Sequence, residues 1–218
     1  ELDGLERERL REELKPFKHI TIHQAWNEDW IGWIECAAYL GAELVTVHHP
    51  LQLEFEEQVR YLHRIGEFAA EKGIRIGVEN VGGRYDEYLS LIKAIDHPAV
   101  GATVDVGHCA YFDEVRNISD TEAKVEKLNS TIEELISLLG EKLYNMHVHN
   151  IRIEDWRDHR SVPKGAVDFR RLMTVLNGIG YGGLFVIELE EPEKEVKVRE
   201  SGEYLSRLIE TDPLTSRS

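Results

Sequence analysis

The stretch GATVDVGH, Gly101–His108, begins with the apolar run Gly101–Asp105, which ends in the carboxylate of Asp105. Five further runs have the same form, with apolar residues leading to a histidine or an acid: His19–His23, Leu44–His48, Ile74–Glu79, Leu143–His147 and Leu184–Glu188. Charged segments of helical period separate the six runs, and this alternation predicts parallel βαβ units. We therefore expect an α/β fold, a (β/α) TIM barrel. The alternative is a flat doubly wound sheet, which needs a glycine-rich phosphate loop after its first strand; this sequence has none there.

Seven amphipathic segments predict helices around these strands. They are Leu5–Leu14, Asp29–Leu40, Phe55–Lys72, Tyr85–Ile95, Asp120–Leu139, Phe169–Asn177 and Lys194–Ile209. Ser119 or Asp120 can begin the longest helix through a side-chain oxygen that accepts a backbone N–H. Glycines at positions 41, 73 and 140 stand where a left-handed residue ends a helix.

Six strands are fewer than the eight of a closed barrel. We expect one strand to be absent ahead of Glu1, where the first helix begins almost at once, and another strand to be short or irregular. No low-complexity linker divides the chain. We therefore predict a single domain over residues 1–210 and a flexible tail over residues 211–218.

The composition argues against several kinds of partner. The 218 residues include 41 acidic and 26 basic ones, and the formal charge of −15 repels phosphate backbones and anionic membranes. We therefore predict no nucleic acid partner and no membrane partner. No apolar run reaches the roughly 18 residues of a membrane span, and Glu1–Glu13 lacks a signal-peptide core. Two distant cysteines, Cys36 and Cys109, suit a reducing compartment, so we expect a cytoplasmic protein.

The ends of the six predicted strands carry the residues suited to chemistry. These residues are His23, His48, Glu79, Asp105, His147 and Glu188. In a parallel barrel the strand ends meet at one mouth, where active sites are assembled. A carboxylate there can also cap the next helix, but three buried carboxylates repel one another unless a cation is present. Three carboxylates and one imidazole suit one divalent ion, manganese, cobalt, magnesium or zinc.

Two more histidines lie close to these strand ends in the sequence. His108 follows Asp105 by three residues, and Gly107 allows the backbone to turn and direct the imidazole toward the mouth. His147 and His149 are two residues apart, so both point to the same side if the strand continues. We predict that His147 is a metal ligand and that His149 supports a ligand or touches the substrate.

Five motifs follow one another along the chain. They are Gly77-Val-Glu79-Asn80, Thr103-Val-Asp105-Val-Gly-His108, Met146-His147-Val-His149-Asn150, His159 with Gly165-Ala-Val-Asp168-Phe169, and Val186-Ile-Glu188-Leu189. In this order they resemble the xylose isomerase-like superfamily of TIM barrels, also known as AP endonuclease family 2. The superfamily includes sugar-phosphate isomerases and epimerases and the endonuclease IV class of abasic-site nucleases. The resemblance runs from about His19 to Glu191.

The resemblance implies a metal-dependent isomerase or epimerase of a sugar or sugar phosphate, working by proton transfer through an enediolate. The implied metal ligands are Glu79, Asp105, His147 and Glu188. Glu79 and Glu188 would also be the catalytic acid and base. The implied substrate-binding residues are His23, His48, His108, His149 and His159. The resemblance is also compatible with a homodimer.

The alternative implied by the resemblance is an endonuclease IV-like, zinc-dependent nuclease acting at abasic sites. In those enzymes the counterparts of His23 and His48 bind zinc, as do an aspartate and a histidine in a later loop. His159 matches that histidine. However, Arg157 stands where the aspartate belongs, and Pro163 replaces a glycine usual in the loop. The third zinc position therefore departs from the nuclease pattern.

Overall fold

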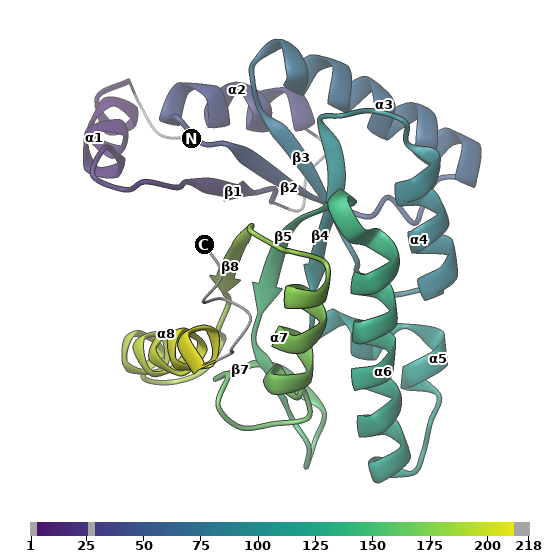
Figure 1. Ribbon diagram of the computed structural model, residues 1–218. Coiled ribbons are helices and arrows are strands. Elements are labelled where there is room, and N and C mark those ends of the chain that lie inside the picture. The colour runs from purple at the N-terminus through teal and green to yellow at the C-terminus, as the bar shows by residue number, and fades with distance from the viewer. Residues whose placement is uncertain (1–3, 26–28, 212–218) are drawn as a thin grey trace. The chain divides into compact units, whose positions relative to one another are not determined.

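The computed structural model describes residues 4–25 and 29–211. The chain divides into two compact units, one drawn from Glu1–Glu79 and Leu91–Gly101, the other from Asn80–Ser90 and Ala102–Ser218. Along the chain, strands that pair in parallel alternate with helices (Figure 1). This order is the one that the βαβ pattern predicted.

The first unit holds three parallel strands and the helices that connect them. In chain order its elements are α1 (Gly4–Leu14), β1 (Thr21–His23), α2 (Trp30–Leu40), β2 (Leu44–His48), α3 (Phe55–Glu71) and β3 (Arg75–Glu79). Helices α2 and α3 lie side by side (Figure 1). Val45 on β2 and Ile76 on β3 pair in register and are fully buried, as expected for strands that are covered on both faces. The same register places His48 opposite Glu79 at the strand ends.

Local sequence fixes where these helices begin and end. The Asp29 side chain accepts a hydrogen bond of 3.0 Å from the N–H of Gly32 and begins α2, while Gly41, with φ of 77°, ends it. At the start of α3, the backbone N–H of Glu54 donates to Glu57 Oε2 over 3.4 Å in a capping box. Gly73, with φ of 71°, follows the end of α3.

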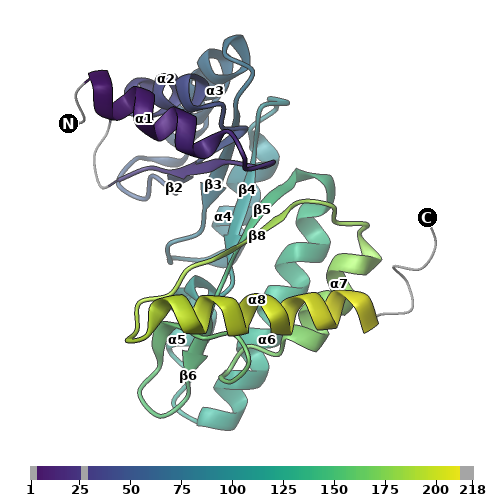
Figure 2. The same cartoon turned by 90° about the vertical axis from the view of Figure 1, so that its left-hand side faces the viewer.

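The second unit holds most of the longer strands and the longest helices. It shares α4 (Tyr85–Ala94) and β4 (Val100–Asp105) with the first unit. Its further elements include η1 (His108–Tyr111), α5 (Asp113–Arg116), α6 (Thr121–Leu139), η2 (Gly140–Lys142), β5 (Leu143–Val148), α7 (Phe169–Gly178), β8 (Leu184–Ile187) and α8 (Lys194–Thr211). Strand β5 pairs in parallel with β4 and with β8. Helices α6 and α7 lie side by side (Figure 1), and Figure 2 shows α8 as one continuous helix.

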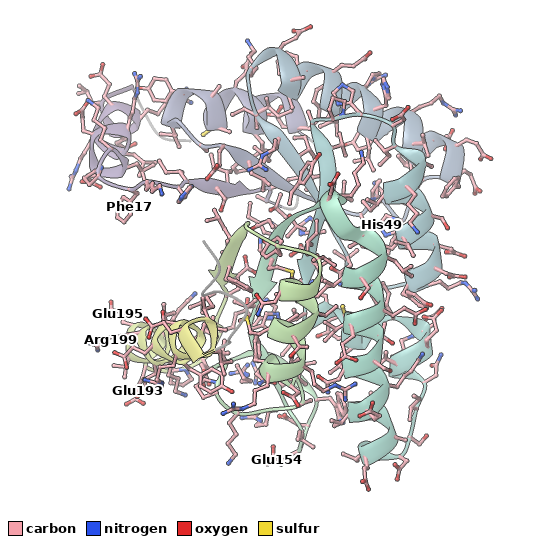
Figure 3. All side chains as sticks on the ribbon, in the orientation of Figure 1. Phe17, His49, Glu154, Glu193, Glu195 and Arg199 are labelled. Atoms are coloured by element: carbon pink, nitrogen blue, oxygen red, sulfur yellow. The ribbon has the colours of Figure 1, made fainter. Side chains whose placement is uncertain are left out.

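An antiparallel hairpin follows β5 and was not predicted. Its strands are β6 (Asn150–Arg152) and β7 (Arg157–Arg160). The sequence of β7, RDHR, has no apolar alternation and therefore gives no strand signal. At the turn, Arg152 Nε donates to Asp155 over 2.8 Å, and the ammonium of Lys124 lies 4.3 Å from the centre of the Trp156 ring. Glu154 projects outward at the tip of this hairpin (Figure 3).

The predicted helices and strands agree with the structure to within two residues at each end. The main corrections concern the strand ends: β5 continues one residue beyond His147, and β8 ends at Ile187, so Glu188 follows the strand. Asp120, not Ser119, caps α6, accepting a 2.8 Å hydrogen bond from the N–H of Ala123. The single domain over residues 1–210 stays a prediction. Residue 211, the first of the predicted tail, is the last residue of α8, and residues 212–218 lie outside the described part of the chain. Among the described helices, none has both the length and the apolar character that crossing a membrane requires.

Candidate functional site

Neighbouring strands of the second unit bring a carboxylate and an imidazole together. The parallel register of β4 and β5 places Asp105 directly opposite His147. Both side chains are buried, with 0% and 2% of their surface exposed. Because side chains alternate along a strand, Asn145 lies on the same side of β5 as His147. The structure therefore places two of the four predicted metal ligands side by side, as the sequence led us to expect of strand ends.

Asp105 is held from several directions. Its carboxylate oxygens lie 2.9 and 3.0 Å from His149 Nε2, and Oδ1 accepts a hydrogen bond of 2.8 Å from the backbone N–H of His108. The side chain of Asn80 fixes the strand end, because its amide donates to the carbonyl of Asp105 over 3.0 Å and its Oδ1 accepts the N–H of Asp105 over 2.9 Å. The carboxylate thus has a fixed orientation before any ligand binds.

The charge state of Asp105 follows from the same neighbours. Burial by itself raises the pKa of a carboxyl group, but the electrostatic interactions with His149, His108 and His147 and the hydrogen bond from His149 lower the pKa of Asp105 well below its usual range. The groups that stabilise the carboxylate are imidazoles rather than lysine or arginine. An ionised, buried carboxylate among imidazoles is a donor set suited to a divalent cation.

Glu188 lies against two histidines. Its Oε1 is 3.3 Å from His147 Nδ1, and its Oε2 is 3.9 Å from His159 Nε2. Its side chain is 27% exposed, far more than that of Asp105. Asp105 is the last residue of β4, whereas Glu188 lies one residue beyond the end of β8. Glu188 is therefore the more accessible of the two predicted carboxylate ligands in this unit.

Three histidines predicted to bind substrate gather around Asp105. The rings of His149 and His159 are stacked, with centroids 4.1 Å apart and planes inclined by 13°. The centroid of the His108 ring lies 6.0 Å from that of His149 and 5.5 Å from that of His159. Each of the three histidines, and Asp105, offers one donor atom within 4.8 Å of the others. This histidine cluster surrounds the carboxylate that the sequence identified first.

Hydrogen bonds assign which ring nitrogens carry hydrogen. His108 Nδ1 lies 3.1 Å from the carbonyl of Asn80, and a carbonyl only accepts, so Nδ1 carries the hydrogen and Nε2 is left with a lone pair. His149 Nδ1 accepts the backbone N–H of His159 over 2.9 Å, so its Nε2 donates to Asp105. His149 is thus a hydrogen-bond partner of a predicted ligand, whereas His108 has a nitrogen free to bind.

The first unit holds the remaining predicted site residues. His23 Nε2 lies 3.1 Å and His48 Nε2 lies 3.7 Å from the same oxygen of Glu79, whose side chain is 1% exposed. The imidazole centroids of His23 and His48 are 5.0 Å apart. His23 Nδ1 contacts the carbonyl of Gln24 over 2.7 Å and so must carry a hydrogen. Nε2 and the carboxylate therefore face each other as two acceptors, unless a second proton or a cation lies between them.

Glycine is needed at position 107 for a reason that the sequence did not reveal. A Cβ atom there would lie 1.9 Å from Cε1 of His149, although Gly107 has the ordinary right-handed φ of −75°. The sequence suggested a sharp turn, but the structure shows a close approach of the backbone to an imidazole. Gly165 has a similar role, since a Cβ would lie 2.2 Å from Asn150 Oδ1.

Four residues near these groups were not among the predicted site residues. They are Asn80, Tyr111, Asn145 and Asp158. Asn80 directly follows Glu79 in its motif, and Asn145 precedes His147 by two residues, so both positions carried a signal. The contacts of Tyr111 and Asp158 join residues that are 47 positions apart and depend on the hairpin, which the sequence did not predict.

Two basic residues of the hairpin are paired with acids. Arg152 bonds to Asp155, and Arg160 lies 4.0 Å from Glu191, which also accepts a 2.9 Å bond from Lys197. Four basic residues, Arg152, Arg157, Arg160 and Lys164, lie close together in the sequence. Two of these four cations have acidic partners, which weakens the cluster as an anion-binding surface.

The sequence profile of a family described as "Xylose isomerase-like TIM barrel" matches residues 20–208. The chain is 28% identical over 184 residues to the uncharacterized protein MJ1311 of Methanocaldococcus jannaschii, a match that covers 77% of this chain and 57% of that protein. It is 25% identical over 155 residues to an inosose dehydratase of Geobacillus thermodenitrificans, covering 63% of this chain and 48% of that protein. The chain thus spans about half the length of these relatives.

Several solved structures share the fold. A D-tagatose 3-epimerase-like protein has a TM-score of 0.68 at 22% identity and matches 95% of this chain and 84% of its own. An L-ribulose 3-epimerase has a TM-score of 0.70 at 15% identity, with 97% and 82% covered. The IolI protein, solved with a zinc atom, has a TM-score of 0.63 at 17% identity, with 97% and 82% covered.

These similarities agree with the architecture of the chain. Six strands pair in parallel in the described residues, where a closed (β/α) barrel has eight, so the fold is an incomplete barrel. The sequence-based prediction of a barrel with missing or irregular strands is confirmed. On the profile match, which covers most of its length, the chain belongs to the xylose isomerase-like TIM barrel family.

Proposed function

We propose that the protein is a divalent-metal-dependent isomerase or epimerase that acts on a sugar or sugar phosphate. The observation that carries this proposal is the buried, ionised Asp105 in register with His147, beside the accessible carboxylate of Glu188. The similar structures named as a D-tagatose 3-epimerase-like protein and an L-ribulose 3-epimerase support the choice of reaction. The zinc in IolI supports the choice of a metal.

The proposed metal ligands are Glu79, Asp105, His147 and Glu188. Their oxygen and nitrogen donors suit manganese, cobalt, magnesium or zinc. The fit is supported by two features: the low pKa of the buried Asp105, and the approach of His23 Nε2 to within 3.1 Å of the buried Glu79 carboxylate. Once bound, the ion would supply positive charge to stabilise the oxygen beside the carbon that loses its proton.

The chain's own residues would move the proton. We assign Glu79 and Glu188 as the groups that remove and return a proton on the carbon next to the carbonyl. Glu188 suits this role because its carboxylate is partly exposed. His108, with a lone pair on Nε2, would accept a hydrogen bond from a substrate hydroxyl. His23, His48, His149 and His159 complete the set of proposed substrate-binding residues.

Metal analysis of protein purified without chelator tests the proposal first. We expect a single manganese, cobalt, magnesium or zinc ion per chain, and we expect a Glu79→Ala variant to lose it. Epimerisation of ketoses and of their phosphates is then assayed with the metal-loaded protein. A correctly folded protein that takes up no metal, even after reconstitution, would contradict the proposal.

A second candidate is a zinc-dependent nuclease that acts at abasic sites. The contacts of His23 and His48 with one oxygen of Glu79 favour it, because two imidazoles and a carboxylate form a typical zinc ligand set. The net charge of −15 and the paired state of Arg152 and Arg160 argue against it. Two or three zinc ions per chain, together with cleavage of abasic DNA, would establish this function instead.

A further inference from the structure

The hairpin of β6 and β7 is fastened to its surroundings on both sides of His159. Ahead of His159, the Trp156 ring contacts Lys124 of α6. Behind it, the N–H of Ser161 donates to Glu191 over 2.7 Å, and the N–H of Val162 donates to the buried hydroxyl of Ser201 over 3.1 Å. The segment that carries His159 is therefore held in place by elements far away in the sequence.

The backbone and one face of His159 are also fixed. Its N–H donates to His149 Nδ1 over 2.9 Å, and its carbonyl accepts the N–H of Glu190 over 2.9 Å. Its ring stacks on the buried ring of His149. The backbone at His159 has φ of 51°, a left-handed conformation that is uncommon for residues other than glycine and that such fixed contacts maintain.

Asp158 connects this histidine to Tyr111. One oxygen of Asp158 accepts a hydrogen bond from the Tyr111 hydroxyl, and the other lies 3.3 Å from His159 Nδ1. Burial raises the pKa of Asp158, but the hydrogen bonds from His159 and Tyr111 lower it by more. The pKa therefore lies below its usual range, and the group stays an anion. A carboxylate only accepts hydrogen bonds, so its partner Nδ1 carries the hydrogen.

We propose that Asp158, held by Tyr111, is a positioning residue that keeps the hydrogen of His159 on Nδ1 and leaves Nε2 as an acceptor for a substrate hydroxyl. His159 Nε2 faces Glu188 Oε2 at 3.9 Å, so a hydroxyl bound by this nitrogen lies beside a proposed catalytic carboxylate. The inference rests on the proposed function only for the identity of that hydroxyl. Asp158 and His159 belong to β7 of the hairpin, and Tyr111 belongs to η1.

The test reads the hydrogen position directly. Ring-nitrogen NMR shifts of His159 are measured in full-length protein labelled with ¹⁵N-histidine and loaded with magnesium or zinc, and a His159→Gln variant assigns the signal. We expect the Nδ1–H form in the unmodified protein and a shift toward the Nε2–H form in Asp158→Ala. Tyr111→Phe, which keeps the carboxylate, should give a smaller shift in the same direction and guards against misfolding of the first variant.

Asp155→Ala is the matched control, because it removes a carboxylate from the same hairpin but one that pairs with Arg152. We expect the His159 signal and the metal content of this control to be unchanged. In sugar assays, Asp158→Ala should lower kcat/KM by about 10–100-fold, the range known for residues that orient metal-binding histidines. Metal content should stay at the level of the unmodified protein.

Three results would overturn the positioning role. They are an Nε2–H form in the unmodified protein, a hydrogen position that does not change in Asp158→Ala, and loss of metal in Asp158→Ala, which would make Asp158 a ligand instead. The outcome is separable from that of the proposed function. A changed hydrogen position in a protein that converts no sugar would support the positioning of His159 while refuting the isomerase proposal.

Discussion

At the residue scale, Gly107 shows how a backbone position can be fixed by a side chain. A methyl group at this position would overlap the imidazole of His149, which is itself bonded to Asp105 and stacked on His159. The ring is fully buried and is held by these contacts. We expect Gly107→Ala to lower the free energy of unfolding by about 1–3 kcal/mol, the usual effect of overpacking a buried site.

The measurement is urea unfolding, with Gly178→Ala as the control. A Cβ at Gly178 meets no atom within 4 Å, so its effect should be small. If the two variants unfold at the same urea concentration, the imidazole of His149 does not prevent position 107 from carrying a methyl group.

Asn145 gives a second prediction at this scale. Its side chain is 1% exposed, and both Nδ2 and Oδ1 are without a partner in the described part of the chain. A buried amide that makes no hydrogen bond destabilises the folded state by about 1–3 kcal/mol. We expect Asn145→Leu, similar in size and apolar, to raise the free energy of unfolding in urea titrations without ligand. A decrease would mean that the amide binds water or another polar group.

Glu188 tests the chemistry itself. If its carboxylate removes the proton from the substrate, Glu188→Gln should abolish the exchange of substrate hydrogen with solvent, because an amide cannot accept that proton. The fold should stay intact, as circular dichroism would confirm. Exchange is followed by proton NMR in deuterated water, with the exposed Glu190→Gln as the neighbouring control. Exchange at the normal rate in Glu188→Gln would remove Glu188 from the mechanism.

At the scale of elements, the start of α7 depends on a single side chain. Asp168 Oδ1 accepts hydrogen bonds from the N–H groups of Arg170 and Arg171, over 2.9 and 3.3 Å. We expect Asp168→Ala to lower the free energy of unfolding by about 1 kcal/mol, as loss of a helix N-cap usually does. The exposed ion pair of Asp155 with Arg152 should contribute less, so Asp155→Ala serves as the control in the same unfolding measurement.

Most elements could be predicted because their sequences carry strong periodic signals. Strand β2, LVTVH, has a β-branched centre, Val45–Val47, and α6 has both a capping aspartate and a glycine after its end. Strand β7 and the short η1 and α5 could not be predicted. They are four residues long each, and their conformation depends on contacts with distant segments such as the bond between Asp113 N–H and the carbonyl of Gly83.

The candidate site was predictable in its residue types but not in its contacts. Period-two alternation is enough to place His147 and His149 on one side of β5. Nothing in the sequence states that His149 would bond to Asp105, which is 44 residues away, or that Asp158 would lie between Tyr111 and His159. Those contacts arise from strand register and from the hairpin, both of which are tertiary features.

At the scale of the whole molecule, the charge of −15 predicts weak interaction with nucleic acid. Proteins that bind DNA nonspecifically gain affinity by neutralising phosphates with lysine and arginine. Here several arginines bond to acids instead, as Arg171 does to Glu126 and Glu133. We expect no change in the fluorescence anisotropy of a labelled abasic duplex at physiological salt. Binding that weakens steeply with salt would favour the nuclease.

Metal binding should stabilise the whole chain if four strand ends share one ion. Glu79, Asp105 and Glu188 carry like charges, and a cation that binds only the folded state raises its stability by about 2.7 kcal/mol at a concentration 100 times its Kd. For a chain of this size, that corresponds to a rise in Tm of roughly 5–11 °C. Differential scanning calorimetry with manganese, and after its removal by chelator, measures the rise. Glu79→Ala should abolish the rise, because Glu79 is a proposed ligand. Asp155→Ala should keep the rise, because Asp155 is not one. An equal rise in both variants would place the ion elsewhere in the molecule.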